Sequence, residues 1–117
     1  PRTIHVTGNT VIDSLLWAKE RLSELAPPFA SRLAGKRLIL VTMHRRESFD
    51  SGIASACAAI AELVARFSDT AVVLPVHPNP NVKGEVERQL GNLERVHLVE
   101  PQEYGHFVWL LDKAHLI

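Results

Sequence analysis

The densest group of side chains that could do chemistry is the run His44, Arg45, Arg46 and Glu47. One imidazole, two guanidiniums and a carboxylate are poor core material, whereas the cationic members suit the binding of an anion. The run follows an apolar stretch at residues 38–41, whose lack of alternation is typical of a strand buried on both faces of a parallel sheet. Ligands of open parallel sheets bind at the carboxyl edge, so the sequence predicts an anion-binding loop at this strand end.

Two further polar loops follow predicted strands in the same way. The loop that begins with His77 comes after the apolar run 71–76, and residues 100–103 come after the short run 96–99. The carboxyl ends of parallel strands meet at one edge of a sheet. We therefore expect all three loops to line one crevice.

The elements that position these loops alternate along the chain. Apolar runs indicate strands, and apolar residues recurring at spacings of three and four indicate amphipathic helices. Strands separated by helices predict right-handed βαβ units, so the predicted class is α/β with a parallel sheet. The expected strands are 3–7, 38–41, 71–76, 96–99 and 114–117, and the expected helices are 11–25, 53–67, 82–90 and 102–113.

Composition argues against several classes of function. Thirteen basic and thirteen acidic residues among 117 give a formal charge of zero, so no global field favours nucleic acid or a membrane surface. No apolar run approaches the roughly 20 residues of a membrane span. The Gly-rich dinucleotide fingerprint and the Walker loop are absent, and the single Cys57 and scattered histidines lack metal-ligand spacing. We expect no metal. Both ends look cut, because the chain starts on Pro1 and ends on an apolar run.

Each candidate residue also has an interpretation that involves no ligand. His44 alone could cap a helix, and its place beside two arginines is what favours a ligand contact. The adjacent Arg46 and Glu47 could pair within the loop. His77 fits a loop role and a ligand contact equally well, and Phe107 on an amphipathic helix is by default a core residue.

Four segments together carry a resemblance to a known family. They are VTGNTVID at 6–13, TMHRRESF at 42–49, LPVHPNPNV at 74–82 and EPQEY at 100–104. In order and spacing they resemble bacterial non-hydrolysing UDP-N-acetylglucosamine 2-epimerases, which have two Rossmann-like domains of the GT-B type. The resemblance implies that residues 1–27 are the end of the first domain and the interdomain helix. Residues 36–117 are then the first half of the C-terminal UDP-binding domain.

The resemblance also implies roles for individual residues. His44 matches the active-site histidine beside the UDP-sugar. Gln102 and Phe107 match positions that hold the uridine, with Phe107 against the uracil ring. Arg45 and His77 match a second, regulatory UDP-GlcNAc site. The implied reaction interconverts UDP-GlcNAc and UDP-ManNAc by elimination and re-addition of UDP, without a cofactor.

Further expectations follow from what the resembling segment lacks. The family's catalytic carboxylates lie in the first domain, so the isolated chain is expected to be inactive. The intact protein is expected to be a cytoplasmic homodimer that binds a UDP-sugar and neither nucleic acid nor a membrane. Pro78 departs from the leucine or methionine usual in that loop. Two other functions stay open: the donor-binding domain of a GT-B glycosyltransferase, and a nucleotide-binding module without activity.

Overall fold

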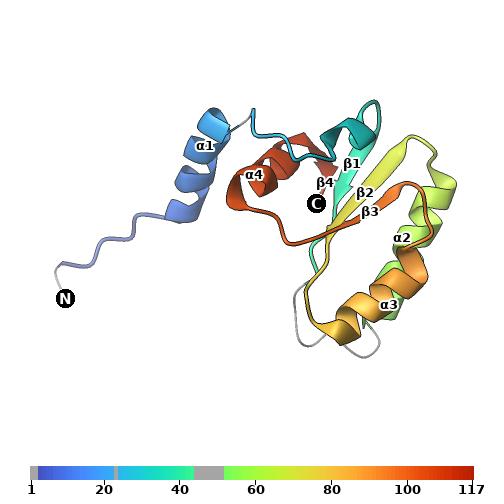
Figure 1. Ribbon diagram of the computed structural model, residues 1–117. Coiled ribbons are helices and arrows are strands. Elements are labelled where there is room, and N and C mark those ends of the chain that lie inside the picture. The colour runs from blue at the N-terminus through green and yellow to red at the C-terminus, as the bar shows by residue number, and fades with distance from the viewer. Residues whose placement is uncertain (1–2, 23, 44–51) are drawn as a thin grey trace.

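The computed structural model describes residues 3–22, 24–43 and 52–117 (Figure 1). From β1 onward strands and helices alternate, as predicted, and the short 3-10 helix η1 lies in the expected connection before β1. The elements in chain order are α1 (Thr10–Leu22), η1 (Ala30–Leu33), β1 (Arg37–Leu40), α2 (Gly52–Arg66), β2 (Thr70–Pro75), α3 (Pro80–Leu90), β3 (Val96–Val99), α4 (Tyr104–Lys113) and β4 (Ala114–Leu116).

The four strands form one parallel sheet in the order β3-β2-β1-β4. β2 is central and pairs with β1 from Thr70 to Val73 and with β3 from Val72 to Pro75. The chain builds outward from β1 through β2 to β3 and then crosses back to the far side of β1, which is the strand order of a Rossmann-type half-sheet. The predicted α/β class with a Rossmann-like parallel sheet is confirmed.

Helices cover both faces of the sheet, and this explains the uninterrupted apolar runs. On one face Val72 and Leu74 pack into a core cluster with α2 and α3. On the other face Leu40 and Val73 pack with Leu110 of α4 and with the η1 segment. Successive side chains of a strand point to opposite faces, so in a strand covered on both sides every side chain is buried and the sequence does not alternate between apolar and polar residues.

α1 lies outside the sheet and packs along α4 (Figure 1). Lys19 Nζ lies 2.7 Å from Asp112 Oδ1, and Ala18 is buried in the contact. Gly105 in the first turn of α4 permits close approach, because a Cβ there would lie 2.9 Å from Leu25 Cδ1. α1 and Leu25 therefore support α4 on the side away from the sheet.

Two expectations are wrong, one at the amino terminus and one at the end of α2. Residues 3–7 form no strand, and Ile4 and Val6 are 70% and 98% exposed. Alternation alone does not make a strand when no strand of the described residues pairs with it. Phe67 lies on the apolar stripe of the helix expected over 53–67 and was predicted to face the core. It is 43% exposed because it follows the last residue of α2 in the turn toward β2.

Candidate functional site

The sheet has a well-defined carboxyl edge, because its ladders continue past the strand ends. The amide of Val41 donates to Val73 O at 2.9 Å, and the amide of Val76 donates to Val99 O at 2.8 Å. The chain therefore leaves β1, β2 and β3 at the same edge of the sheet.

Two of the three predicted polar loops lie at this edge, at residues 76–79 and 100–103. Residues 41–43 bring the chain to the start of the third. His44 and Arg45, the predicted active-site and regulatory residues of that loop, lie outside the described residues. The prediction that these loops emerge at one edge of the sheet is confirmed for the two loops that the structure describes, and the crevice between the three loops stays a prediction.

His77 is exposed and its ring is fixed by its own loop. The amide of Asn79 donates to His77 Nδ1 at 3.2 Å. In the neutral imidazole an accepting Nδ1 leaves the proton on Nε2, so the ring presents an N–H donor to solvent. The arrangement suits His77 to donate a hydrogen bond to an anionic or carbonyl oxygen.

α3 begins directly at this edge. Asn79 O accepts the amides of Val82 at 3.1 Å and Lys83 at 3.0 Å, and Pro80 occupies the first helical position, where its missing N–H costs no helix bond. The positive end of the helix dipole is thereby placed beside the loop of His77.

Lys83 lies at the candidate edge and was not singled out by the sequence interpretation. Its Nζ lies 3.9 Å from Glu100 Oε1 in the loop after β3 and 3.9 Å from Glu87 Oε1 in its own helix. The ammonium group therefore connects the first turn of α3 with the loop after β3. The available signal was its place in the first turn of a helix that starts at the binding edge.

Gln102 is half-buried in the loop after β3. Its Nε2 donates to Glu100 O at 2.6 Å, which folds the side chain back across the loop. The bond fixes the amide close to the start of α4 and defines how the loop turns away from the sheet.

Phe107 lies on α4 and is half-buried. Its amide donates to Glu103 O at 2.9 Å in the first turn. Its ring packs against the core cluster that includes Leu40 and Leu110, so the predicted inward orientation is confirmed. Because the ring is only half-buried, one part anchors α4 and another part remains accessible.

Within residues 3–22, 24–43 and 52–117, no group of three or more His, Cys, Asp or Glu side chains is arranged to hold a metal ion. Cys57 is fully buried in the core, where burial raises the pKa of its thiol. None of the described helices is long and apolar enough to cross a membrane.

Comparison with known proteins decides the family. The family model described as UDP-N-acetylglucosamine 2-epimerase matches residues 1–117, the whole chain. The chain belongs to this family. The resemblance carried by the four sequence segments is thereby confirmed.

Individual relatives agree with this assignment. A Salmonella typhimurium UDP-N-acetylglucosamine 2-epimerase is 49% identical over 121 residues, which cover 97% of this chain and 32% of the relative. The Escherichia coli K12 protein of the same name is 46% identical over the same shares. The chain therefore spans about a third of the length of these relatives.

Solved structures show the same fold. The Neisseria meningitidis UDP-GlcNAc 2-epimerase bound to UDP-GlcNAc matches with a TM-score of 0.82 and 36% identity, over 98% of this chain and 33% of that protein. The Staphylococcus aureus MnaA–UDP co-structure matches with a TM-score of 0.88 and 28% identity, over 98% of this chain and 31% of that protein.

Proposed function

We propose that this chain is part of a UDP-GlcNAc 2-epimerase, an isomerase that interconverts UDP-GlcNAc and UDP-ManNAc. In this proposal residues 1–27 end the first domain of a GT-B-type enzyme and supply the interdomain helix. Residues 36–117 form the first half of the UDP-binding domain. The observation that carries the proposal is the family match along the whole chain, together with the polar loops that meet at the carboxyl edge.

The proposed reaction requires the negative charge on the leaving diphosphate to be stabilised at that edge. Epimerisation at carbon 2 proceeds by elimination of UDP to a 2-acetamidoglucal, followed by protonation on the other face and re-addition of UDP. The C2 proton is weakly acidic, so departure of the diphosphate drives the first step. Fixed donors and cations around a diphosphate leaving group lower this barrier by about several kcal/mol.

His44 is the residue we assign to the leaving diphosphate. Its ordinary pKa of about 6.5 lets an imidazole serve as a cation or as a neutral N–H donor near neutral pH. The base and the acid that act on carbon 2 come from outside these 117 residues. The isolated chain is therefore expected to be inactive, and the intact protein to be a cytoplasmic homodimer.

Gln102 and Phe107 are assigned to the uridine, and the structure gives each a physical basis. The half-buried Phe107 ring is anchored by the core and keeps an accessible part on which a base can stack. Gln102 lies two residues before the start of α4 and carries an amide that can read a uracil edge. Arg45 and His77 are assigned to a second, regulatory UDP-GlcNAc site, to which His77 brings its Nε2–H donor.

The test of the reaction uses the intact protein that contains this chain. Incubation with UDP-GlcNAc in D2O, followed by NMR, is expected to yield UDP-ManNAc without an added acceptor and with deuterium at carbon 2. His44→Asn is expected to slow turnover by about a hundredfold or more, as loss of a preorganised donor does. Product formation that requires an acceptor would contradict the proposal and favour a glycosyltransferase.

The test of the uridine assignment uses matched variants. Phe107→Leu is expected to weaken UDP binding about tenfold, since stacking on an aromatic ring is worth about 1–3 kcal/mol. Phe29→Leu is the control, because Phe29 packs against the same core cluster and has no assigned role in binding. Gln102→Ala is compared with Gln89→Ala, whose amide instead donates to Glu85 within α3. Equal affinities in each pair, measured by calorimetry, would refute the assignment.

A further inference from the structure

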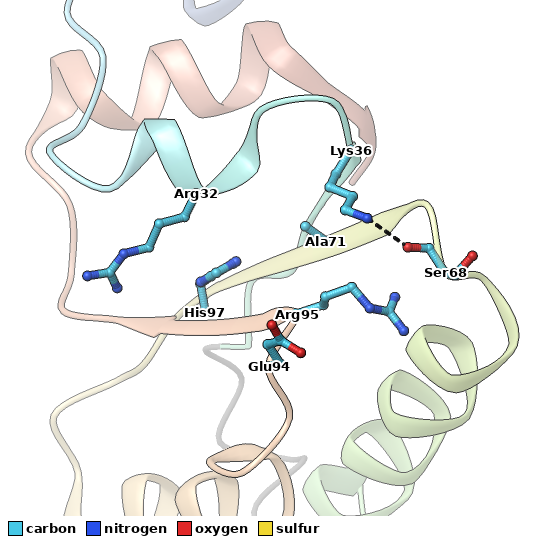
Figure 2. A pocket seen from close by; sticks show the side chains of 7 residues that line it. All are labelled: Arg32, Lys36, Ser68, Ala71, Glu94, Arg95 and His97. Carbon is cyan, nitrogen blue, oxygen red and sulfur yellow. Dashed lines mark hydrogen bonds between the residues drawn. The ribbon is translucent and has the colours of Figure 1, made fainter.

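A polar cavity lies at the opposite, amino-terminal edge of the sheet (Figure 2). Its volume is about 510 Å³. Its walls come from residues that precede or open the strands and from η1, on the face of the sheet that α4 covers. They are Arg32, Lys36, Ser68, Ala71, Glu94, Arg95 and His97.

The cavity gathers three basic side chains that form no ion pair with a carboxylate of the described residues, although Glu94 lines the cavity and the charge of Lys36 acts on Asp69. Ten basic side chains lie in the described part of the chain, and six of them form its ion pairs. The other four are Arg32, Lys36, Arg66 and Arg95, of which all but Arg66 line this cavity. Against Glu94 the three give a formal charge of +2 when His97 is neutral.

Two of these cations are held in place by backbone carbonyls. Lys36 Nζ donates to Ser68 O at 3.0 Å. Arg95 donates to Phe67 O at 2.7 Å, to Thr70 O at 3.0 Å and to Val64 O. Carbonyl oxygens fix the positions of the cationic groups without cancelling their formal charge, so both groups remain sources of positive charge in the cavity wall.

Arg32 and His97 are the members that remain available to a ligand. Arg32 is exposed on η1, and Figure 2 shows its side chain and the His97 ring lying on the same side of β3. Burial lowers the pKa of His97, and the nearby Arg32 charge lowers it further. Lys36, Arg95 and Glu94 are the other charged groups around the cavity. An anion between Arg32 and the ring would oppose both effects and favour the protonated imidazole.

We propose that this cavity binds a tetrahedral oxyanion, phosphate or sulfate, between Arg32 and His97, with Lys36 and Arg95 supplying fixed positive charge. A guanidinium presents paired N–H donors to such an anion. The site lies at the edge of the sheet away from His77 and Gln102, so it is separate from the proposed nucleotide site and does not depend on it.

The experiment follows the His97 ring by NMR in the intact protein while sodium sulfate is added, with sodium chloride at equal ionic strength as the reference. Sulfate keeps its charge between about pH 6 and about pH 8, so a change of its affinity over that range reports on protonation of the protein and not of the anion. We expect a saturable shift of the His97 signals, tighter binding at the lower pH, and a raised His97 pKa in the presence of sulfate.

Matched variants decide whether the site is the one described. Arg32→Gln is expected to weaken sulfate binding about tenfold, the usual effect of losing a charge-assisted hydrogen bond. Arg66→Gln removes the same charge from a residue outside the cavity and is expected to leave the affinity unchanged. No saturable His97 shift, or equal effects of the two variants, would overturn the proposal.

The same titration distinguishes a free anion from one carried by a larger molecule. Inorganic phosphate and UDP are added in separate arms to the wild type and to Arg32→Gln. An Arg32-dependent His97 response to phosphate alone supports a site for the free ion. An Arg32-dependent response to both supports a site for a phosphate group on a nucleotide. A response to neither phosphate nor UDP would refute the claim that the cavity binds phosphate.

Discussion

Replacing Arg95 by Met tests whether one guanidinium ties the end of α2 to the starts of β2 and β3. Val64 O is among the last four carbonyls of α2, which the helix leaves without amide donors. Phe67 O keeps two other donors, Thr70 Oγ1 at 2.7 Å and the Thr70 amide at 3.2 Å, so Val64 O and Thr70 O depend most on Arg95. Two hydrogen bonds to a charged group, partly replaced by water at this half-exposed position, correspond to a loss of about 2 kcal/mol in the free energy of unfolding.

Urea unfolding followed by circular dichroism measures this loss, with Arg88→Met as the matched control. Arg88 pairs with Glu85 on the exposed surface of α3, and its loss is expected to change the unfolding midpoint little. Hydrogen exchange of residues 64–72 is expected to accelerate in Arg95→Met and not in the control. If the two variants unfold at the same urea concentration and exchange alike, Arg95 does not tie these elements together.

Further substitutions test the packing that positions the site. Gly84→Ala is expected to raise the free energy of unfolding by about 0.5–1 kcal/mol, because an added Cβ meets no atom within 4 Å in the helix. Gly91→Ala is expected to lower it, since a Cβ there would lie 2.5 Å from a backbone oxygen, and thermal unfolding of both variants shows the sign. Leu110→Ala, at a fully buried position, is expected to cost about 2–5 kcal/mol in urea unfolding. The hydrogen bond from Lys19 is the main cause that lowers the pKa of Asp112. The ionised Asp112 therefore stabilises the folded state above the unfolded pKa of about 3.9, and this contribution disappears as pH falls through the lower folded pKa. We expect Asp112→Asn to remove the contribution, so unfolding of both proteins at several pH values measures it.

The sheet and its helices were predictable because each carries its own local signal. The run 71–76 is apolar without interruption, and the observed strand Thr70–Pro75 lies in the centre of the sheet, where both faces are covered. The strand Val96–Val99 has the predicted bounds. The helix predicted over 82–90 begins two residues earlier, at Pro80, because proline is tolerated at the first helical position.

The side-chain environment of the site was less predictable, because it depends on segments distant in sequence. Lys83 carries no motif, and its approach to Glu100 follows from how α3 packs beside the loop after β3. Arg32 and His97 share a cavity only because η1 lies over the amino-terminal half of the sheet. His97 read alone is a strand residue, and the neighbours that shift its pKa come from outside β3.

β3 shows why the two edges of this sheet can carry different sites. His97 faces the side of the sheet opposite Val96 and Leu98, which pack with α2 and α3, and Arg95 in the turn before β3 donates to carbonyls at the end of α2. Glu100 and Gln102 follow the same strand at its other end. Between the ends, the paired residues from Val72–Val96 to Pro75–Val99 form a close-packed ladder. A substitution of Arg32 or His97 therefore alters the charge at the amino edge and leaves the backbone that carries Gln102 supported. Loss of oxyanion binding at the amino edge is then not by itself evidence against nucleotide binding at the carboxyl edge, and the reverse also holds.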